Sequence, residues 1–377
     1  MKEKTKAIHG LTNKEKQHKF QKGIASPISI SSSFYFNTIQ EAQGAFAGEH
    51  QGYVYSRGRN PSQEEFEEKM TLLEEGSFAV AFASGMGAIA TTLLALLKPE
   101  DTLLAHSMLY GSSHNLIKNL LPEYGIKTIM TDLNTIDKEK IGQLKAESRR
   151  LVIYFETPVN PTLETISIEE IRSKTGSEAI IIVDNTFATP ILQKPLLLGA
   201  DLVLHSCTKY IGGHGDAVGG IVVGKDPAWE NNLRYGYMCE FGATMAPFNA
   251  WLFNRGLKTL SLRVLEHQKN AKEIAAYLKT EKLVEKVYYP GFGGMVAFTL
   301  KGDAVAFVEA LKLFTLAVSL GDVESLVELP FQMTHRDYEP QELEGNISNL
   351  VRISAGLEDK DDLIADLKEA FKTCQEA

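Results

Sequence analysis

Cysteine is scarce in this chain, which has three such residues among 377: Cys207, Cys239 and Cys374. Thiols so few and so scattered exclude a disulfide framework and favour a reducing compartment, so we expect a cytoplasmic protein. Positive charge is also in the minority, because 39 basic against 48 acidic side chains give a net charge of −9. This balance makes the chain a poor candidate for binding nucleic acid or an anionic membrane surface.

Long apolar runs are missing as well. The longest, Ala88–Leu97, contains two threonines and is about half as long as the roughly 20 residues that a membrane-spanning helix needs. The first twenty residues carry lysines but no apolar segment, so neither a signal peptide nor a transit peptide is expected. A chain of 377 residues exceeds what one hydrophobic core usually holds, which predicts two domains.

Hydrophobic patterning divides the chain into three parts. Residues 1–55 have no clear period. Residues 56–246 alternate short runs rich in Val, Ile and Leu with helical stretches, which predicts an α/β domain with a mostly parallel sheet. Ser62 and Glu65 have the spacing of a capping box, so we expect Ser62 to start a helix that stops at Gly76. Residues 247–377 combine a long helical stretch with shorter strands and a closing helix, which predicts a smaller α+β domain.

A glycine-containing junction, Ala83-Ser-Gly-Met-Gly-Ala-Ile-Ala90, follows an apolar strand and opens an apolar helix. Backbone N–H groups at such a junction can form an anion cup, and a simple strand-to-helix turn is the structural alternative. Gly85–Ala90 also matches the dinucleotide fingerprint G-x-G-x-x-A, which suggests a nicotinamide-dependent oxidoreductase. That function needs an acidic residue at the end of the next strand, and His106-Ser107 stands there. A dinucleotide site is therefore disfavoured.

Two further strand ends carry chemically useful side chains. Asp184 follows Ile180–Val183, and Lys209 follows Leu202–His205 with a hydroxyl residue on each side of Cys207, Ser206 and Thr208. Alone, Asp184 would be interpreted as a turn residue and Lys209 as a solvated surface lysine. Together with the anion cup they supply what pyridoxal 5′-phosphate (PLP) requires, namely a lysine, an acid for the ring nitrogen and a phosphate site.

Other constellations point to different chemistry but are weaker. Tyr110 could stack on the PLP ring, although a core or rim tyrosine is as good an interpretation. The spacing of His205, Cys207 and His214 matches no usual zinc pattern, so no metal is expected. No G-x-S-x-G motif occurs, which argues against an α/β-hydrolase.

Several motifs resemble those of the Cys/Met-metabolism (trans-sulfuration) family of PLP-dependent enzymes, in the right order over nearly the whole chain. They are Tyr53-Val-Tyr-Ser-Arg-Gly-Arg-Asn-Pro61, Ala83-Ser-Gly-Met86, Glu156-Thr-Pro-Val-Asn-Pro161, Val183-Asp-Asn-Thr-Phe187, Ser206-Cys-Thr-Lys-Tyr-Ile-Gly-Gly-His214 and Ile353-Ser-Ala-Gly-Leu-Glu-Asp359. The resemblance implies a fold-type I (aspartate-aminotransferase-like) architecture and a homotetramer built from two active dimers.

The resemblance also implies roles for individual residues. Lys209 would form the Schiff base with PLP and act as the base at Cα, while Asp184 would hold the ring nitrogen. Tyr110 would stack on the ring, contact the substrate and serve as acid or base. The phosphate would be bound by Gly85, Met86, Ser206 and Thr208, and by Tyr55 and Arg57 of the neighbouring subunit, which residues 1–55 would contact. Arg352 would pair with the substrate carboxylate, and Asn160 and Ser319 would complete the substrate shell.

Within the family the chain most resembles methionine γ-lyases, which implies γ-elimination of L-methionine or a related sulfur amino acid to 2-oxobutanoate, ammonia and a thiol. Apolar Val318 stands where cystathionine-handling members typically carry glutamate. Three departures bear on the substrate: Ser112 replaces a usual cysteine, Met238-Cys239 replaces a usual Lys-Asp pair, and the segment 289–295 is short.

Other functions remain open on the sequence. Within the family the rivals are a cystathionine γ-lyase, a cystathionine γ-synthase and an O-acylhomoserine sulfhydrylase. A nicotinamide-dependent oxidoreductase and a non-catalytic binding protein are the rivals from other classes.

Overall fold

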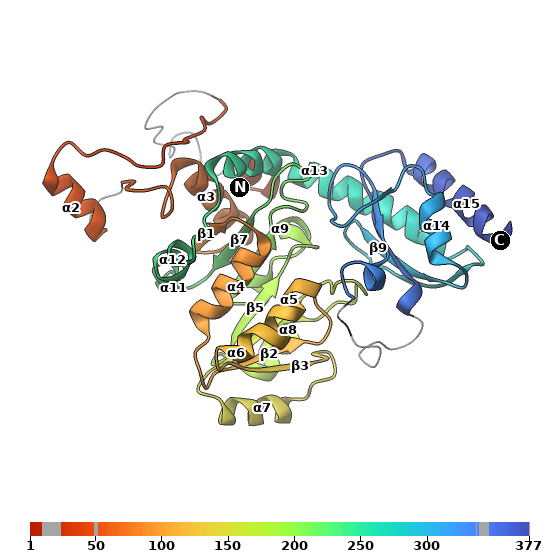
Figure 1. The fold of residues 1–377 in the computed structure, drawn as a ribbon, viewed down its shortest axis with the longest axis horizontal. Helices are drawn as coiled ribbons and strands as arrows, with labels where there is room; N and C mark the ends of the chain where they lie inside the picture. Colours follow the sequence, from red (N-terminus) through yellow and green to blue (C-terminus); the bar gives the residue numbers. More distant parts are fainter. Residues whose placement is uncertain (10–23, 49–51, 337, 339–346, 377) are drawn as a thin grey trace.

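The computed structural model describes residues 1–9, 24–48, 52–336, 338 and 347–376 (Figure 1). In this part of the chain, a seven-stranded sheet has the order β1-β7-β6-β5-β4-β2-β3. All of its strands run parallel except β7, which is antiparallel to both neighbours. The bounds are β1 Phe78–Phe82, β2 Thr102–His106, β3 Lys127–Thr131, β4 Leu151–Glu156, β5 Ile180–Asp184, β6 Leu202–Ser206 and β7 Gly220–Gly224.

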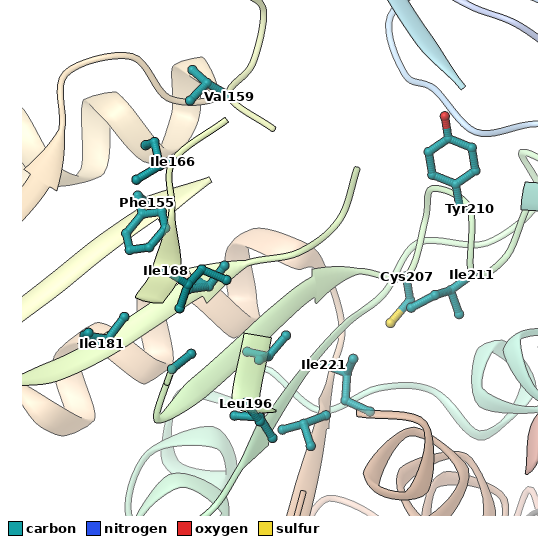
Figure 2. Packing of buried hydrophobic residues seen from close by; sticks show 14 of the residues in the cluster. Phe155, Val159, Ile166, Ile168, Ile181, Leu196, Cys207, Tyr210, Ile211 and Ile221 are labelled. Atoms are coloured by element: carbon teal, nitrogen blue, oxygen red, sulfur yellow. The ribbon is translucent and has the colours of Figure 1, made fainter. Parts of the chain in front are cut away.

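Helices cover both faces of this sheet, so its central strands are buried on both sides, as their continuous apolar character predicts. One face packs mainly against α3 Pro61–Glu74, α7 Lys138–Glu147, α8 Ile168–Thr175, α10 Pro195–Leu198 and α13 Pro247–Leu278. Figure 2 shows part of this core, where Phe155 of β4 and Ile181 of β5 lie near Ile166 and Ile168. The other face packs against α4 Gly85–Leu96, α6 Leu121–Glu123 and the π-helices η1 Leu116–Leu120 and η2 Asn232–Met238. The short helix α5 Gly111–Asn115 directly precedes η1.

A second sheet lies toward the C-terminus, with the order β10-β11-β12-β9-β8 in the described residues. Its bounds are β8 Val284–Tyr288, β9 Met295–Leu300, β10 Thr315–Leu316, β11 Leu326–Glu328 and β12 Leu350–Ser354. It packs against α14 Ala304–Ala310, α15 Lys360–Glu376 and the second half of α13. The long helix α13 therefore connects the two sheets (Figure 1). The domain boundaries expected at 55/56 and 246/247 stay predictions.

The remaining elements are short. They are α1 Glu3–His9, α2 Ile39–Ala47, α9 Thr189–Leu192, α11 Ala228–Asn231, α12 Cys239–Phe241 and the 3₁₀ turns η3 Pro330–Gln332 and η5 Ile347–Asn349. Helix α2 stands away from the rest of the chain at the end of an extended segment (Figure 1). In the described residues, no helix combines the length and apolar character needed to cross a membrane.

The expectation that Ser62 caps the start of α3 is wrong, because the N-cap lies two residues earlier. The helix begins at Pro61, and its N-cap is Asn60, whose side chain accepts a hydrogen bond from the Ser62 N–H. Proline has no N–H to satisfy and its φ suits the first helical position, so Asn60-Pro61 is a stronger start signal than the Ser62/Glu65 pair. The helix ends at Glu74 with Glu75 in the left-handed conformation, one residue before the expected Gly76.

Candidate active site

A cavity of about 280 Å³ lies at the carboxyl ends of β4, β5 and β6 and extends to β12 of the second sheet. Parallel strands place their carboxyl ends at the same edge, where α/β proteins usually bind ligands. The residues that line it include all of the expected site residues except Tyr55 and Arg57, namely Gly85, Met86, Tyr110, Asn160, Asp184, Ser206, Thr208, Lys209, Ser319 and Arg352.

Lys209 follows β6 and reaches into this cavity. Its Nζ donates a hydrogen bond to Ser319 Oγ at 2.9 Å. Burial, reinforced by the positive charge of Arg352, lowers the pKa of Lys209 to about 8. A desolvated amine of this kind is available as a nucleophile or base near neutral pH.

Ser319 itself has φ of 107°, in the region that L residues rarely adopt. Such strain persists only where surrounding contacts determine the backbone, and it is common at functional sites. Here the backbone oxygen of Ser319 accepts a hydrogen bond from Arg352 Nη2 at 3.1 Å, while its hydroxyl contacts Lys209. The strained residue thus connects the two cations of the cavity.

Asp184 is the last residue of β5, and its Oδ1 accepts a hydrogen bond from the Thr186 N–H at 2.9 Å. Burial raises the pKa of this carboxyl, whereas the hydrogen bonds from Thr186 and the nearby His205 act in the opposite direction. His205 is itself buried, with its Nε2 2.6 Å from Glu74 Oε1. A buried carboxylate in this position would gain from a cationic ligand atom.

The phosphate cup expected from the sequence lies at the first turn of α4. Ser84 caps the helix, and its Oγ accepts a hydrogen bond from the Gly87 N–H at 2.9 Å. Gly85 and Met86 line the cavity beside the hydroxyl residues Ser206 and Thr208. At this helix turn the backbone N–H groups have no intrahelical acceptor, and the helix dipole favours an anion.

A side chain at Gly85 would close this cup, because an added Cβ would lie 2.9 Å from Ser206 Cβ and 3.0 Å from Ser206 Oγ. The cradle between α4 and β6 therefore depends on glycine. Hydroxyl and backbone donors suit a phosphate, Lys209 suits an aldehyde carbon, and Asp184 suits a protonated ring nitrogen. The residues present fit PLP.

Arg352 lines the cavity from β12 of the second sheet. Its Nη1 donates to Asn160 Oδ1 at 2.7 Å, and its Nη2 lies 3.0 Å from Glu328 Oε1. Glu328 on β11 is the register partner of Arg352. Burial lowers the pKa of Arg352, and the Glu328 carboxylate acts against that change. A planar guanidinium held from several sides is preorganised to bind a carboxylate.

Two acids of this region are not among the site residues that the sequence predicts. Glu156 lines the cavity at the end of β4, and it stands at a strand end like Asp184, so the same pattern could have found it. Glu328 is in a three-residue strand that the hydrophobic pattern does not indicate.

Tyr55 and Arg57 do not line this cavity. They line another one, of about 610 Å³, together with Phe46, Tyr235 and Cys239. The Cys239 thiol contacts the backbone oxygen of Arg57, with Sγ and O 3.4 Å apart. Within this chain the arm that carries Tyr55 and Arg57 thus lies against η2 and α12 rather than against Lys209.

The three departures from the methionine γ-lyase pattern also lie outside the cavity. Ser112 is exposed on α5, Met238 is buried, and Cys239 belongs to the cavity of Tyr55 and Arg57. Residues 289–295 are all described, and none of them lines the cavity around Lys209. Val318 does line it, and its side chain is 54% exposed.

No cluster of three or more His, Cys, Asp or Glu side chains in the described residues is arranged to hold a metal ion. Cys207 and His205 are buried, and His205 is paired with Glu74.

The family model of Cys/Met metabolism PLP-dependent enzymes matches residues 4–372. An L-methionine γ-lyase from Fusobacterium nucleatum subsp. polymorphum is 40% identical, over 98% of this chain and 97% of its own. A cystathionine β-lyase from Lactococcus lactis subsp. cremoris is 39% identical, over 98% of both chains. Among solved structures, the chain is similar to a putative O-acetylhomoserine (thiol)-lyase from Campylobacter jejuni, whose crystal structure carries a pyridoxyl-lysine phosphate. The two superpose with a TM-score of 0.92 at 29% sequence identity, over 99% of this chain and 100% of the other. The fold is therefore PLP fold type I, and the cofactor is PLP.

Proposed function

The chain belongs to the Cys/Met metabolism family of PLP-dependent enzymes, and on this basis we propose that it catalyses γ-elimination of L-methionine or a related sulfur amino acid. With methionine, one water is consumed, and 2-oxobutanoate, ammonia and methanethiol are released. The observation that carries the proposal is a cavity that joins Lys209, Asp184 and Arg352 to an apolar wall residue, Val318.

Each reacting part of the substrate has a matching group in the cavity. PLP, when bound, supplies an electron sink for the electrons freed at Cα. Lys209 removes the proton from Cα and then one from Cβ, for which its lowered pKa of about 8 is suited. Asp184 keeps a proton on the ring nitrogen by its negative charge. Arg352 binds the substrate carboxylate, and Asn160 and Ser319 hold the guanidinium in place.

Tyr110 stands at the start of α5 and lines the same cavity. In the proposed reaction its ring would stack on PLP, and its hydroxyl would give a proton to the departing thiolate. The phosphate of PLP would be held by the backbone of Gly85 and Met86 and by the hydroxyls of Ser206 and Thr208.

Val318 supports a thioether substrate over cystathionine. A distal ammonium group would need an anionic partner on this wall, whereas a methyl group gains from contact with an apolar side chain. The wall also includes the apolar residues Val218 and Leu320.

A substrate panel on the purified holoenzyme tests the proposal. Methionine, homocysteine, cystathionine and an O-acylhomoserine are compared by release of 2-oxobutanoate, pyruvate and thiol. We expect the highest kcat/KM for methionine or homocysteine, with 2-oxobutanoate as the product. Pyruvate from cystathionine would indicate β-elimination, and thiol-dependent consumption of the O-acylhomoserine would indicate a sulfhydrylase; either result as the main activity overturns the proposal.

The role of Lys209 is tested by Lys209→Ala. The variant should lose the yellow chromophore that borohydride reduces and fixes to the protein, together with all activity. A variant that retains both properties would contradict the assignment. The substrate panel also tests the alternative of a non-catalytic binding protein, because such a protein would bind PLP without turning over any substrate in the panel.

We further propose that Tyr55 and Arg57 serve the phosphate site of a neighbouring subunit. Both residues lie outside the cavity of their own chain, and the segment around them exposes the large apolar side chains of Tyr35, Ile39 and Phe46. Mixed oligomers of Lys209→Ala and Arg57→Ala subunits should regain activity, because one mixed site would have both functional residues. No recovery of activity on mixing would contradict a shared site.

The assembly of the chain into a homotetramer and its location in the cytoplasm stay predictions.

A further inference from the structure

Glu156 is a buried acid that the proposed reaction does not use. It ends β4, its side chain is 6% exposed, and it lines the cavity beside Tyr110 and Asp184. Its register partner on β5 is Asp184. Two carboxyl groups at adjacent strand ends in a buried cavity require a structural or functional reason, because each pays a desolvation cost.

Glu156 accepts hydrogen bonds from the backbone of Tyr110 and from that of Asn160. Glu156 Oε1 accepts a hydrogen bond from the Tyr110 N–H at 2.8 Å. Tyr110 precedes α5 and contributes no side-chain cap to it in the described structure. Its side chain is 40% exposed, so packing within this chain holds the ring only in part. The direction of the ring therefore depends strongly on how the backbone is held.

The neighbouring residue Gly111 is in close contact with a second segment. An added Cβ at Gly111 would lie 2.2 Å from the backbone oxygen of Thr334, so the two backbones are in close contact there. Thr334 Oγ1 in turn donates to Glu328 Oε1 at 3.1 Å. Gly111 thus packs against the backbone of Thr334, which lies after β11. The hydrogen bond to Glu156 connects Tyr110 to the end of β4.

Burial and the nearby Asp184 carboxylate raise the pKa of Glu156 to about 8. In its protonated form Glu156 retains a carbonyl oxygen that accepts the Tyr110 N–H. It adds no second negative charge beside Asp184, so Asp184 can remain the anion of this strand edge. A neutral glutamine at position 156 has the same shape and the same acceptor.

We propose that Glu156 is the positioning residue for Tyr110: it holds the backbone of Tyr110 so that the ring is directed into the cavity at the position required for catalysis. The inference rests on the proposed function in so far as Tyr110 acts in catalysis. Glu156 acts through Tyr110 and does not itself exchange a proton with the substrate.

The test compares three substitutions of Glu156 in the holoenzyme. Glu156→Gln keeps the acceptor, Glu156→Ala removes it, and Glu156→Leu removes it while filling the space, which serves if the alanine variant does not fold. Glu147→Gln is the matched control, because Glu147 is on α7 with its side chain 60% exposed. Two properties are measured: the circular dichroism of the bound cofactor in the visible region, and kcat and KM for the best substrate of the panel.

We expect Glu156→Ala and Glu156→Leu to change the visible circular dichroism and to lower kcat by about tenfold to a hundredfold, since a displacement of about 1 Å can cost about a hundredfold. KM should change less than kcat, because the hydrogen bonds and the ion pair that hold the Arg352 guanidinium come from Asn160, Ser319 and Glu328 rather than from Glu156. Glu156→Gln should keep the visible circular dichroism of the parent enzyme and a kcat within about threefold of it, because the glutamine oxygen can accept the same backbone hydrogen bonds.

A Tyr110→Ala background isolates the route of the effect. If Glu156 acts through Tyr110, adding Glu156→Ala to Tyr110→Ala should lower kcat no further. Additive losses, an unchanged circular dichroism in Glu156→Leu, or a glutamine variant as impaired as the leucine variant would each overturn the inference. An enzyme without methionine activity but with the expected change in circular dichroism would instead overturn the proposed function alone.

Discussion

Replacing Lys209 by Met should stabilise the cofactor-free protein at neutral pH. In the folded chain burial lowers the pKa of Lys209 from 10.5 to about 8, so at pH 7 folding places a charged amine where it is poorly solvated. A methionine has a similar length and no charge. A buried polar group maintained for function at the expense of stability is a common trade-off in active sites.

The size of the effect follows from two opposing contributions. A lowering of the pKa from 10.5 to about 8 corresponds to about 3 kcal/mol of destabilisation of the charged form. The substitution also removes the hydrogen bond from Lys209 Nζ to Ser319 Oγ, which contributes about 1 kcal/mol. The net gain in the free energy of unfolding is then about 2 kcal/mol. For a chain of 377 residues this gain corresponds to a rise of about 2 to 3 °C in Tm.

The pH dependence has a definite sign. Below pH 8 Lys209 is protonated in both the folded and the unfolded chain, so the full penalty applies. Between pH 8 and 10.5 the unfolded chain binds more protons at this site than the folded chain, so the unmodified protein becomes more stable as pH rises. The advantage of Lys209→Met should therefore be largest at pH 7 and should diminish through this range.

Calorimetry of the cofactor-free proteins at pH 7, 8, 9 and 10 measures the difference in Tm between the two chains. Lys140→Met is the control, because Lys140 is exposed on α7, and a surface substitution should change stability by less than about 0.5 kcal/mol. A lower Tm for Lys209→Met than for the unmodified chain at pH 7 would show that burial does not destabilise the protonated form of Lys209. A difference in Tm that stays constant up to pH 10 would show the same.

Three further predictions concern ligand binding. Arg352→Lys keeps the positive charge but loses the planar guanidinium that can bind a carboxylate with two hydrogen bonds. We therefore expect kcat/KM to fall by at least about a hundredfold, while the absorbance of bound PLP stays the same. A loss of less than threefold would contradict the role of Arg352. Val318→Glu adds an anion to a half-exposed wall, so the ratio of kcat/KM for cystathionine to that for methionine should rise by about fivefold, and an unchanged ratio would remove Val318 as a specificity residue. Gly85→Ala places a Cβ 2.9 Å from Ser206 Cβ and should weaken PLP about tenfold in an absorbance titration, whereas unchanged affinity would place the phosphate elsewhere.

Local sequence features predicted the elements that carry the site. The strands that end at Asp184 and Ser206 are marked by uninterrupted apolar runs, and their burial on both faces follows from that composition. The start of α3 shows the limit of such features, because two neighbouring positions both have the residue types of a helix start. The helix begins after Asn60, at Pro61, and not after Ser62. The strand β11 is only three residues long, too short for a hydrophobic period to reveal.

The sequence by itself determined the α/β class, the family and the convergence of Lys209, Asp184 and the Gly85 cup. These conclusions depend on local order along the chain and on the general rule that parallel strands end at one edge of a sheet. Only the tertiary structure decided that Glu156 holds the Tyr110 backbone, that Glu328 pairs with Arg352, and that Tyr55 and Arg57 lie outside the cavity of their own chain. Those contacts join residues far apart in the sequence, and strand register and burial, which no local pattern encodes, bring them together.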